Sequence, residues 1–442
     1  NNKHLEPLGT RAIDDEIILL KVQTNQSELR IAQAARTRIF RNGDPLKETP
    51  DTGDEQGYIA AHFTMDVQKG AELCVEKVLA LFTSRDNATC ECALEAEKAS
   101  KHAGGFDELV RSHTRAWKHL WGRFDIEFEE SAPPEEDRTG MILHLHTFHL
   151  LQSTSMHTMD LDVGVPSRGW HGEAYRGHIF WDELFIFPFL DLRVPEITRA
   201  LLMYRYRRIH EARAAAREAG YKGAMYPWQS GSNGREESQK IHLNPKSGRW
   251  IPDNSRHQRH VNAAIVRNIL QYYEVTEDKE FLSFYGAEMI LEIARFWASI
   301  SRYNPDLGRY EILGVMGPDE YHEAYPASDR PGLDNNAYTN IMAVWVLVEA
   351  LKVLGILPED RRTELCETLE LEEEELDRWR DISRKMRVVF HHDGIISQFQ
   401  GYEELEDLDW ERYRKEHGEV IRLDRVLEAE GDTPNRYKAS KQ

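Results

Sequence analysis

The sequence predicts a mainly α protein with an N-terminal β part, and three observations support this fold class. Residues 16–84 hold short runs rich in β-branched and aromatic residues between polar turns. Residues 88–123 change to a composition dominated by Ala, Glu and Lys, which favours helix. After Gly140 the chain continues as apolar helical segments separated by long polar loops.

The β part is predicted from runs at residues 17–22 (IILLKV), 57–63 (GYIAAHF) and 75–82 (VEKVLALF). Because these runs are short and bounded by polar or Gly-containing turns, we expect part of an antiparallel β-sandwich over residues 1–88. A helical linker is predicted over residues 89–138. Its apolar and aromatic side chains recur at three- and four-residue steps: Phe106, Leu109, Val110, His113, Trp117 and Leu120.

A helical domain is predicted over residues 139–442. Helices are expected at residues 195–220 and 281–300 and from Thr339, whose hydroxyl can cap a helix. Between the helices lie long loops rich in Gly, Trp, Tyr, His and carboxylates, at residues 168–182, 221–242, 244–260 and 314–336. Since loops of this length in a compact domain often carry binding or catalytic residues, we expect the functional site to be built from them.

The charge balance excludes two classes of partner. Lys and Arg number 56 against 76 Asp and Glu, which gives a formal net charge of −20 and a sequence pI of about 5.5. Nucleic acid and anionic membranes both demand a positive face, so neither is expected as a partner. The apolar run at residues 341–357 carries Glu349 and Lys352 and is shorter than a membrane span, so no transmembrane helix is expected.

The cysteines indicate where the protein is located, and the two ends of the chain indicate whether it is part of a longer protein. Four scattered cysteines do not make a disulfide scaffold, so a reducing, cytoplasmic location is expected. The first residue is Asn1, no signal peptide is visible, and the last residues before Gln442 read as an interrupted helix start. We therefore expect a fragment of a longer protein, open at both ends.

An acidic loop is the first candidate for catalysis. Gly317 and Pro318 predict a turn directly before two carboxylates, Asp319 and Glu320. A carboxyl held there among aromatic side chains would have a raised pKa and could donate a proton to a leaving oxygen. The alternative is a solvated acidic loop, which is common in a protein with 30% charged residues.

Two aromatic and acidic segments indicate sugar binding. Trp181 is followed by Asp182, and the segment at residues 226–237 places Tyr226 and Trp228 ahead of Glu237. An indole stacks on the C–H face of a sugar ring while carboxylates accept hydrogen bonds from its hydroxyls. The alternative for each tryptophan is a core position.

Other chemistries lack their signatures. The histidines at 144, 146 and 149 and at 257 and 260 do not have the spacing of a zinc site. Phosphate-binding loops, dinucleotide fingerprints and nucleophile elbows are absent from the sequence. No metal or cofactor is therefore expected.

Several short stretches, which follow one another in the same order as in the family, make the sequence resemble glycoside hydrolase family 65. The members of this family are inverting phosphorylases of α-glucosides such as maltose, trehalose, kojibiose and nigerose, with a few hydrolases. The stretches are residues 177–183 (GHIFWDE), 223–231 (GAMYPWQSG), 258–262 (QRHVN), 317–322 (GPDEYH), 335–340 (NNAYTN) and 441–442 (KQ). The resemblance covers essentially the whole chain. It implies an (α/α)6 barrel, incomplete here, after part of a β-sandwich and a helical linker.

The resemblance also implies roles for individual residues. Glu320 matches the general acid of the family. The residues that match its binding site for the non-reducing glucose are Trp181, Asp182, Lys441 and Gln442, and weaker candidates for the same pocket are Tyr226, Trp228 and Glu237. Many members have Trp-Asp-Thr-Glu where this chain has Trp-Asp-Glu-Leu, so no role is carried over to Glu183.

The function implied is an inverting phosphorylase that uses inorganic phosphate to release β-glucose 1-phosphate from an α-linked glucose disaccharide. The main alternative is an inverting hydrolase of the same family, since the residues that separate the two activities are expected beyond Gln442. A sugar-binding protein without catalysis, and a lyase or isomerase using Tyr321 or His322, also stay open. Dimers are common in the family, so a homodimer is allowed, and the loop at residues 324–334 is expected to shape the acceptor side.

Overall fold

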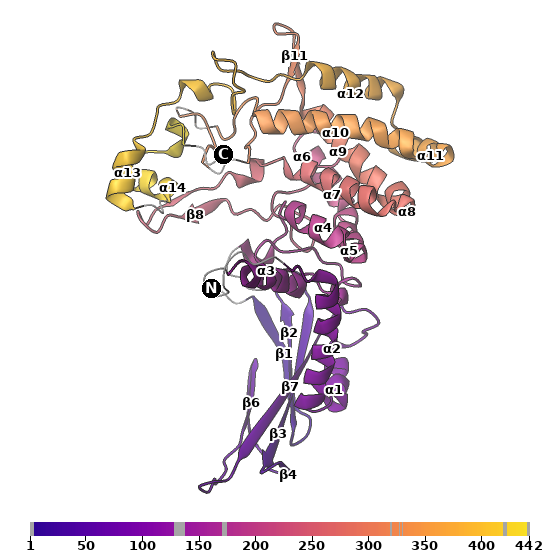
Figure 1. Cartoon of the computed structure of the whole chain (residues 1–442), viewed down its shortest axis with the longest axis vertical. Coiled ribbons are helices and arrows are strands. Elements are labelled where there is room, and N and C mark those ends of the chain that lie inside the picture. Colours follow the sequence, from indigo (N-terminus) through magenta and orange to yellow (C-terminus); the bar gives the residue numbers. More distant parts are fainter. Residues whose placement is uncertain are drawn as a thin grey trace. The chain divides into compact units, whose positions relative to one another are not determined.

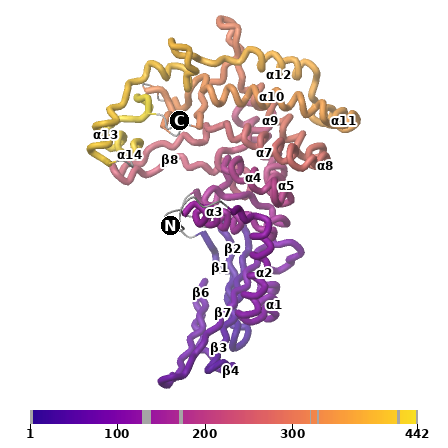
Figure 2. Tube along the Cα trace, in the orientation of Figure 1, coloured from indigo at the N-terminus to yellow at the C-terminus, as the bar shows by residue number. Residues whose placement is uncertain are grey.

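The computed structural model describes residues 4–127, 138–169, 175–318, 321–326, 328, 330–418 and 422–439. The chain divides into two compact units, the first of residues 1–148 and 157–162 and the second of residues 149–156 and 163–442. The first unit carries the sheet and the second is mainly helical (Figures 1 and 2).

The first unit is built on a five-stranded antiparallel sheet with the order β1-β2-β3-β4, in which β7 also pairs with β3. The strands are β1 (Leu5–Ala12), β2 (Ile17–Thr24), β3 (Arg30–Arg41), β4 (Asp44–Leu46) and β7 (Leu73–Thr83). A separate hairpin joins β5 (Asp51–Glu55) to β6 (Tyr58–His62). The three predicted runs thus fall on β2, β6 and β7.

Helix α1 (Cys92–His102) covers one face of this sheet (Figure 1). Its Cys92 and Ala96 pack on the buried Ile17 and Ala32 of the strands. Arg36 of β3 is 1% exposed and donates hydrogen bonds to the carbonyl oxygens of Ser100, Ala103 and Gly104 at the end of α1. A cation at a helix C-terminus satisfies carbonyls that have no partner within the helix. Helices α2 (Phe106–Phe124) and α3 (Thr139–Ser153) follow.

The second unit consists of helices joined by long loops and small hairpins. Helix α9 packs on α10 and α7, α4 packs on α7, and α10 packs on α12 (Figure 1). Its longer helices are α4 (Glu183–Asp191), α5 (Pro195–Tyr206), α6 (Ile209–Glu218), α7 (Val261–Thr276), α9 (Ala287–Ile300), α10 (Ala337–Ile356), α11 (Glu359–Leu369), α12 (Glu373–Lys385), α13 (Trp410–His417) and α14 (Leu423–Glu430). The smaller elements are α8 (Lys279–Phe281), β8 (Ile241–Leu243), β9 (Trp250–Pro252), β10 (Arg302–Asn304) and β11 (Arg309–Glu311).

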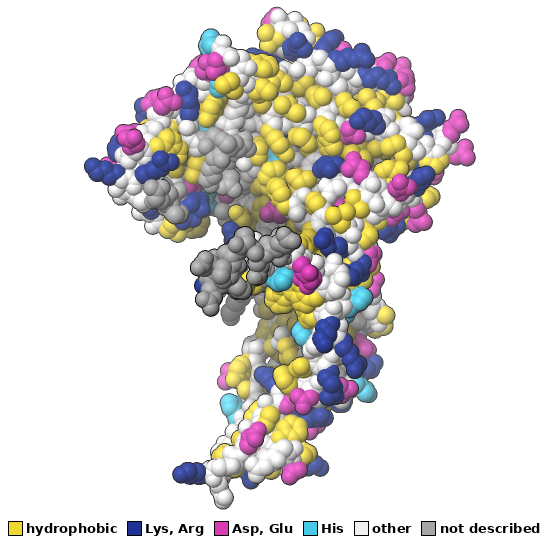
Figure 3. Space-filling view, viewed as in Figure 1, with side chains coloured by type: hydrophobic (Ala, Val, Ile, Leu, Met, Phe, Trp, Pro, Cys, Tyr) yellow, Lys and Arg dark blue, Asp and Glu magenta, His cyan; other side chains and the backbone are white. Residues whose placement is uncertain are grey.

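Helix α10 is long and apolar enough to cross a membrane by length and composition alone, and 44% of its most apolar window is buried within the protein. It packs against α7, α9 and α12, as a core helix does. Figure 3 shows apolar side chains gathered over α9 and α10 on the face in view. The predicted cap was wrong: Asn336 caps α10, because its side-chain oxygen accepts from the backbone N–H of Thr339 at 3.0 Å.

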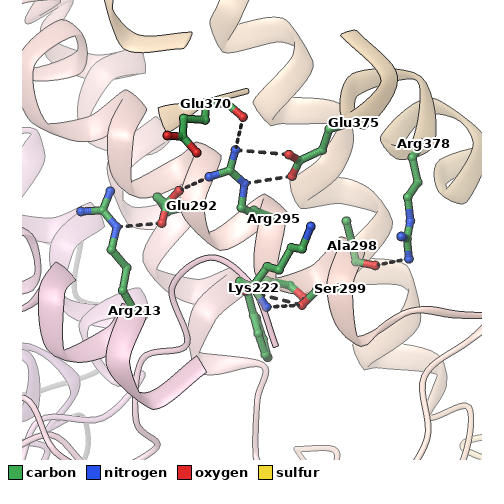
Figure 4. Close-up of polar contacts among 10 residues, drawn as sticks. Arg213, Lys222, Glu292, Arg295, Ala298, Ser299, Glu370, Glu375 and Arg378 are labelled. Atoms are coloured by element: carbon green, nitrogen blue, oxygen red, sulfur yellow. Dashed lines mark hydrogen bonds and ion pairs between the residues drawn. The ribbon is translucent and has the colours of Figure 1, made fainter. Parts of the chain in front are cut away.

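A chain of ion pairs ties α6, α9 and α12 together (Figure 4). Glu292 of α9 accepts from Arg213 at 2.7 Å and from Arg295 at 2.9 Å, and Arg295 also donates to Glu375 at 2.9 Å. Glu292 is only 4% exposed, so these pairs are screened less than pairs on the surface. The network fixes α9, against which one site loop rests.

Candidate functional site

A cavity of about 980 Å³ lies in the second unit. All four loops that the sequence singled out contribute to its lining, with residues such as Trp181, Trp228, Asp253 and Tyr321. A further wall comes from α14 and from residues 432–435, which the sequence analysis did not identify. The described part of the lining mixes aromatic, amide and charged side chains.

Two of these loops are joined by backbone pairing. Ile179 and Ser230 exchange two N–H···O=C hydrogen bonds, each 2.9 Å long. This pairing brings Trp181 and Trp228 together, with ring centroids 6.0 Å apart. Both tryptophans line the cavity, and their predicted role in sugar binding stays a prediction.

The loop that carries Trp228 is held at both ends. At its start, Gly223 has a φ of 74°, and a Cβ there would lie 2.2 Å from the carbonyl oxygen of Glu292 in α9. Only glycine fits so close to another backbone in this conformation. At the other end, the carboxylate of Glu236 accepts from the backbone N–H groups of Trp228 and Gln229 at 2.8 and 3.1 Å.

Asp182 lines the cavity beside Trp181. It is half-buried at the N-terminus of α4, and its side chain does not cap the helix. Burial raises the pKa of Asp182, and the nearby Arg168 guanidinium partly opposes this rise. Its carboxylate is therefore placed to accept hydrogen bonds from hydroxyl groups in the cavity.

Glu183, the residue at which this chain departs from the family pattern, is not among the residues that line the cavity. It is 1% exposed, and its carboxylate accepts from Nε and a terminal nitrogen of Arg205 at 3.1 and 2.9 Å. Arg205 also donates to the carbonyl oxygen of Phe180 at 2.8 Å. The pair therefore supports the segment before Trp181 and does not line the cavity.

Tyr226 and Glu237 are not among the residues that line the cavity. Tyr226 is 1% exposed, and its hydroxyl donates to the carbonyl oxygen of Arg205 at 3.1 Å. The side chain of Glu237 lies against Gly231, whose added Cβ would be 3.1 Å from it. The neighbouring Glu236, which the sequence analysis did not select, holds the loop. The predicted roles of Tyr226 and Glu237 in sugar binding stay predictions.

The proposed general acid, Glu320, and its neighbour Asp319 lie outside the described residues, as do Lys441 and Gln442. The base of the acidic loop is described. Val315 and Leu333 exchange backbone hydrogen bonds of 3.0 and 2.8 Å, which close the loop. A Cβ at Gly317 would lie 2.3 Å from the side chain of Asn336, so glycine is needed at the predicted turn.

Residues next to these undescribed positions share one apolar cluster. Tyr321, which follows Glu320, packs in a cluster that also holds Leu408, Leu423 and Ala439. Ala439 is 0% exposed and lies two positions before Lys441. Tyr321 itself lines the cavity. The roles predicted for Glu320, Lys441 and Gln442 stay predictions.

Glu323 is a cavity carboxyl that the sequence analysis did not select. It accepts from the side-chain amide of Asn254 at 2.8 Å, and its backbone N–H donates to the side-chain oxygen of Asn435 at 2.9 Å. Burial raises the pKa of Glu323, the hydrogen bond from Asn254 opposes the rise, and Asp253 adds to it. Among the described residues of the loop at 324–334, which we expected to shape the site, none lines the cavity.

Two histidines, His257 and His260, flank the cavity residue Gln258 in the sequence, and His260 packs on both tryptophans. His260 is 0% exposed, with its ring centroid 4.8 Å from that of Trp181 and 5.0 Å from that of Trp228. Burial lowers the pKa of His260 to about 3, and burial with the charges of Arg259 and Arg256 lowers that of His257 to about 4. Both are therefore neutral near pH 7.

Across the described ranges, no group of three or more His, Cys, Asp or Glu side chains could hold a metal ion.

Comparisons with known proteins place the chain in a family. The family model for the glycosyl hydrolase family 65 central catalytic domain matches residues 144–442, and that for the N-terminal domain of the same family matches residues 1–120. A trehalose 6-phosphate phosphorylase of Lactococcus lactis is 37% identical over 96% of this chain and 52% of that protein. A kojibiose phosphorylase of Halothermothrix orenii is 34% identical over 95% of this chain and 54% of that protein.

A longer relative and a solved structure agree with this assignment. A protein of Mycobacterium tuberculosis named as an uncharacterized glycosyl hydrolase is 48% identical over 100% of this chain and 33% of that protein. A solved structure titled as a putative kojibiose phosphorylase from human microbiome has a TM-score of 0.74 at 22% identity, over 99% of this chain and 54% of that chain. The chain thus spans about a third to a half of the length of these relatives.

The fold similarity confirms the predicted class, in which a β-sandwich part and helical linker precede the helices of an (α/α)6 barrel. The family assignment rests on the match of the catalytic-domain model to most of the chain. The chain belongs to glycosyl hydrolase family 65.

Proposed function

We propose that the complete protein is an inverting phosphorylase of an α-linked glucose disaccharide, with Glu320 as its general acid and inorganic phosphate as co-substrate. Two of the relatives named above carry phosphorylase names, one for trehalose 6-phosphate and one for kojibiose. A further relative, from Thermoanaerobacter brockii, is named α,α-trehalose phosphorylase and is 30% identical over 80% of this chain. Because these names refer to disaccharides with different linkages, the proposal does not specify the linkage.

The cavity is the observation that carries the proposal. Trp181 and Asp182 line it together with Met316 and Tyr321, which stand on either side of the segment that contains Glu320. An aromatic plane and a carboxylate in one cavity suit a glucose ring. Trp181, Asp182, Lys441 and Gln442 are proposed to hold the non-reducing glucose, with Trp228 beside them.

The proposed reaction needs one acid and one nucleophile. Glu320 donates its proton to the glycosidic oxygen as the bond between that oxygen and the anomeric carbon breaks. A phosphate oxygen forms its bond to the anomeric carbon from the opposite face, which inverts the configuration. The products are β-glucose 1-phosphate and a free sugar. Phosphate is already nucleophilic, so no catalytic base, metal or further cofactor is required.

We also propose a location and partners for the protein. The cysteines, Cys74, Cys90, Cys92 and Cys366, are all free, as suits a reducing cytoplasm. A homodimer is proposed from the family resemblance alone. With a net charge of −20, nucleic acid and membrane are not proposed as partners.

The test uses the complete protein with maltose, trehalose, kojibiose, nigerose and trehalose 6-phosphate, each with and without inorganic phosphate. Release of β-glucose 1-phosphate that requires phosphate, detected by NMR, is expected for one of them. Glu320→Gln should reduce the rate at least about 1,000-fold, whereas the exposed Glu374→Gln should not. Free β-glucose released equally without phosphate would identify a hydrolase. Binding without turnover would identify a sugar-binding protein.

A further inference from the structure

One tryptophan of the cavity is exposed. Trp250 lines the cavity in β9, yet 64% of its surface is exposed to solvent. By contrast, Trp228 is 8% exposed, and its ring and that of Trp181 pack on each other and on His260. Within the described parts of the chain, no ring contact is recorded for Trp250. Trp250 therefore presents an exposed indole at the cavity.

The hairpin that carries Trp250 is fixed in place. Strands β8 and β9 pair so that Leu243 lies opposite Trp250. Glu428 of α14 accepts hydrogen bonds from Asn244, from Ser247 at 2.5 Å and from Nε of Arg249 at 2.7 Å, which are all in the hairpin. Figure 1 shows α14 beside β8. Because one carboxylate accepts hydrogen bonds from three residues of the turn, the backbone that carries Trp250 is held in position before a ligand arrives.

Polar groups suited to sugar hydroxyls lie in the same part of the sequence. His242 and Asp253, one on each side of the hairpin, line the cavity, and Asn254 holds the cavity carboxyl Glu323. An aromatic face with carboxylates and amides beside it suits an uncharged sugar ring. This set is distinct from Trp181, Asp182 and Trp228, which are proposed to bind the glucose that is transferred.

We propose that Trp250 is the stacking platform for the acceptor sugar, the one released in phosphorolysis, and that Glu428 is the positioning residue that holds it. The proposal rests on the proposed function and adds a binding site to it. The greater exposure of Trp250 assigns it to the open side of the cavity, where the second sugar enters and leaves.

The test is the reverse reaction of the complete enzyme with β-glucose 1-phosphate and, as acceptor, the sugar that the active disaccharide releases, which is D-glucose or, from trehalose 6-phosphate, D-glucose 6-phosphate. Trp250→Ala should raise the KM for this acceptor about tenfold and change the KM for β-glucose 1-phosphate by less than about twofold. Trp250→Phe should restore most of the acceptor affinity because it keeps an aromatic face. Glu428→Ala should raise the acceptor KM as well, and Glu428→Gln should raise it less. The exposed Glu218→Gln should change neither constant.

Two outcomes would overturn the inference: unchanged constants in Trp250→Ala, or an equal rise in both. If the wild type neither makes nor consumes β-glucose 1-phosphate, the proposed function fails instead. Calorimetric titration with the five disaccharides then tests the platform separately. Binding that weakens about tenfold in Trp250→Ala and recovers in Trp250→Phe supports it, and binding that is absent or unaffected by the substitution refutes it.

Discussion

The carboxylate of Glu236 accepts the backbone N–H of Trp228 at 2.8 Å, and so a side chain eight positions further along sets the conformation of the cavity tryptophan. Its second oxygen binds the N–H of Gln229 and the N–H and hydroxyl of Ser238. Replacing it would leave several donors without their acceptor, at about 1 kcal/mol for each hydrogen bond.

We therefore expect Glu236→Ala to lower kcat/KM about 10- to 100-fold while the far-UV circular dichroism stays unchanged. Glu236→Gln, which keeps one acceptor oxygen, should lose less. The matched control is Glu218→Gln on α6, where the side chain is exposed. Equal activity of Glu236→Ala and the wild type would show that the loop keeps its shape without this carboxylate.

We expect Asp182 to lower the stability of the folded state at neutral pH and to be needed for sugar binding. Burial raises its pKa, so the folded state holds the proton more tightly than the unfolded chain and the carboxylate form costs stability as the pH rises. Asp182→Asn should therefore be more stable than the wild type at pH 8, with a difference that shrinks toward pH 4. Its activity should fall at least about 100-fold. Thermal unfolding across this pH range is the measurement, with the exposed Asp306→Asn as control.

His260 is expected to make the helical unit sensitive to acid. Its pKa is about 3 in the folded state against about 6.5 for an unfolded histidine, so only the unfolded chain takes up the proton as the pH falls below 6.5. The free energy of unfolding should drop by up to about 1.4 kcal/mol per pH unit from this residue. His260→Phe should flatten that slope between pH 6 and pH 5 in urea unfolding. The exposed His210→Gln should keep it.

Gly223 is expected to tolerate no side chain. An alanine there would combine a φ of 74° with a Cβ only 2.2 Å from the carbonyl oxygen of Glu292. Gly220 is a matched control, because its φ is 80° and a Cβ would meet nothing within 4 Å. Gly220→Ala should cost about 1 kcal/mol of backbone strain, and Gly223→Ala distinctly more. Equal melting temperatures of the two variants would contradict the close approach.

The sequence predicted those elements whose apolar residues recur with a clear period. The runs on β2, β6 and β7 and the helix at residues 106–124 were found in this way. Strand β3 was missed because its buried positions include Ala32, Ala34 and the charged Arg36, which do not read as an apolar strand. The buried Arg36 makes sense only once its carbonyl partners at the end of α1 are known.

The same distinction applies to the site. The loops of the cavity were predicted from their length and composition, and Trp181, Asp182 and Trp228 do line it. The wall from α14 could not be predicted, because Arg249 and Glu428 meet across 179 positions of sequence. Local patterns carry no information about such a contact. The choice between Glu236 and Glu237 likewise depends on which carboxylate the turn directs at the backbone of Trp228.

The closure of the acidic loop by Val315 and Leu333 has a consequence for how this enzyme family can diversify. The two backbone hydrogen bonds join the ends of the segment, and Ala324 and Pro331 pair again inside it. Since the entropy of closing a loop grows only slowly with its length, residues can be inserted or deleted within residues 326–330 at little cost to the packed positions of Tyr321 and Glu323. Residues 326–330 are therefore a natural place for evolution, or an engineer, to exchange one loop tip for another while the barrel stays unchanged.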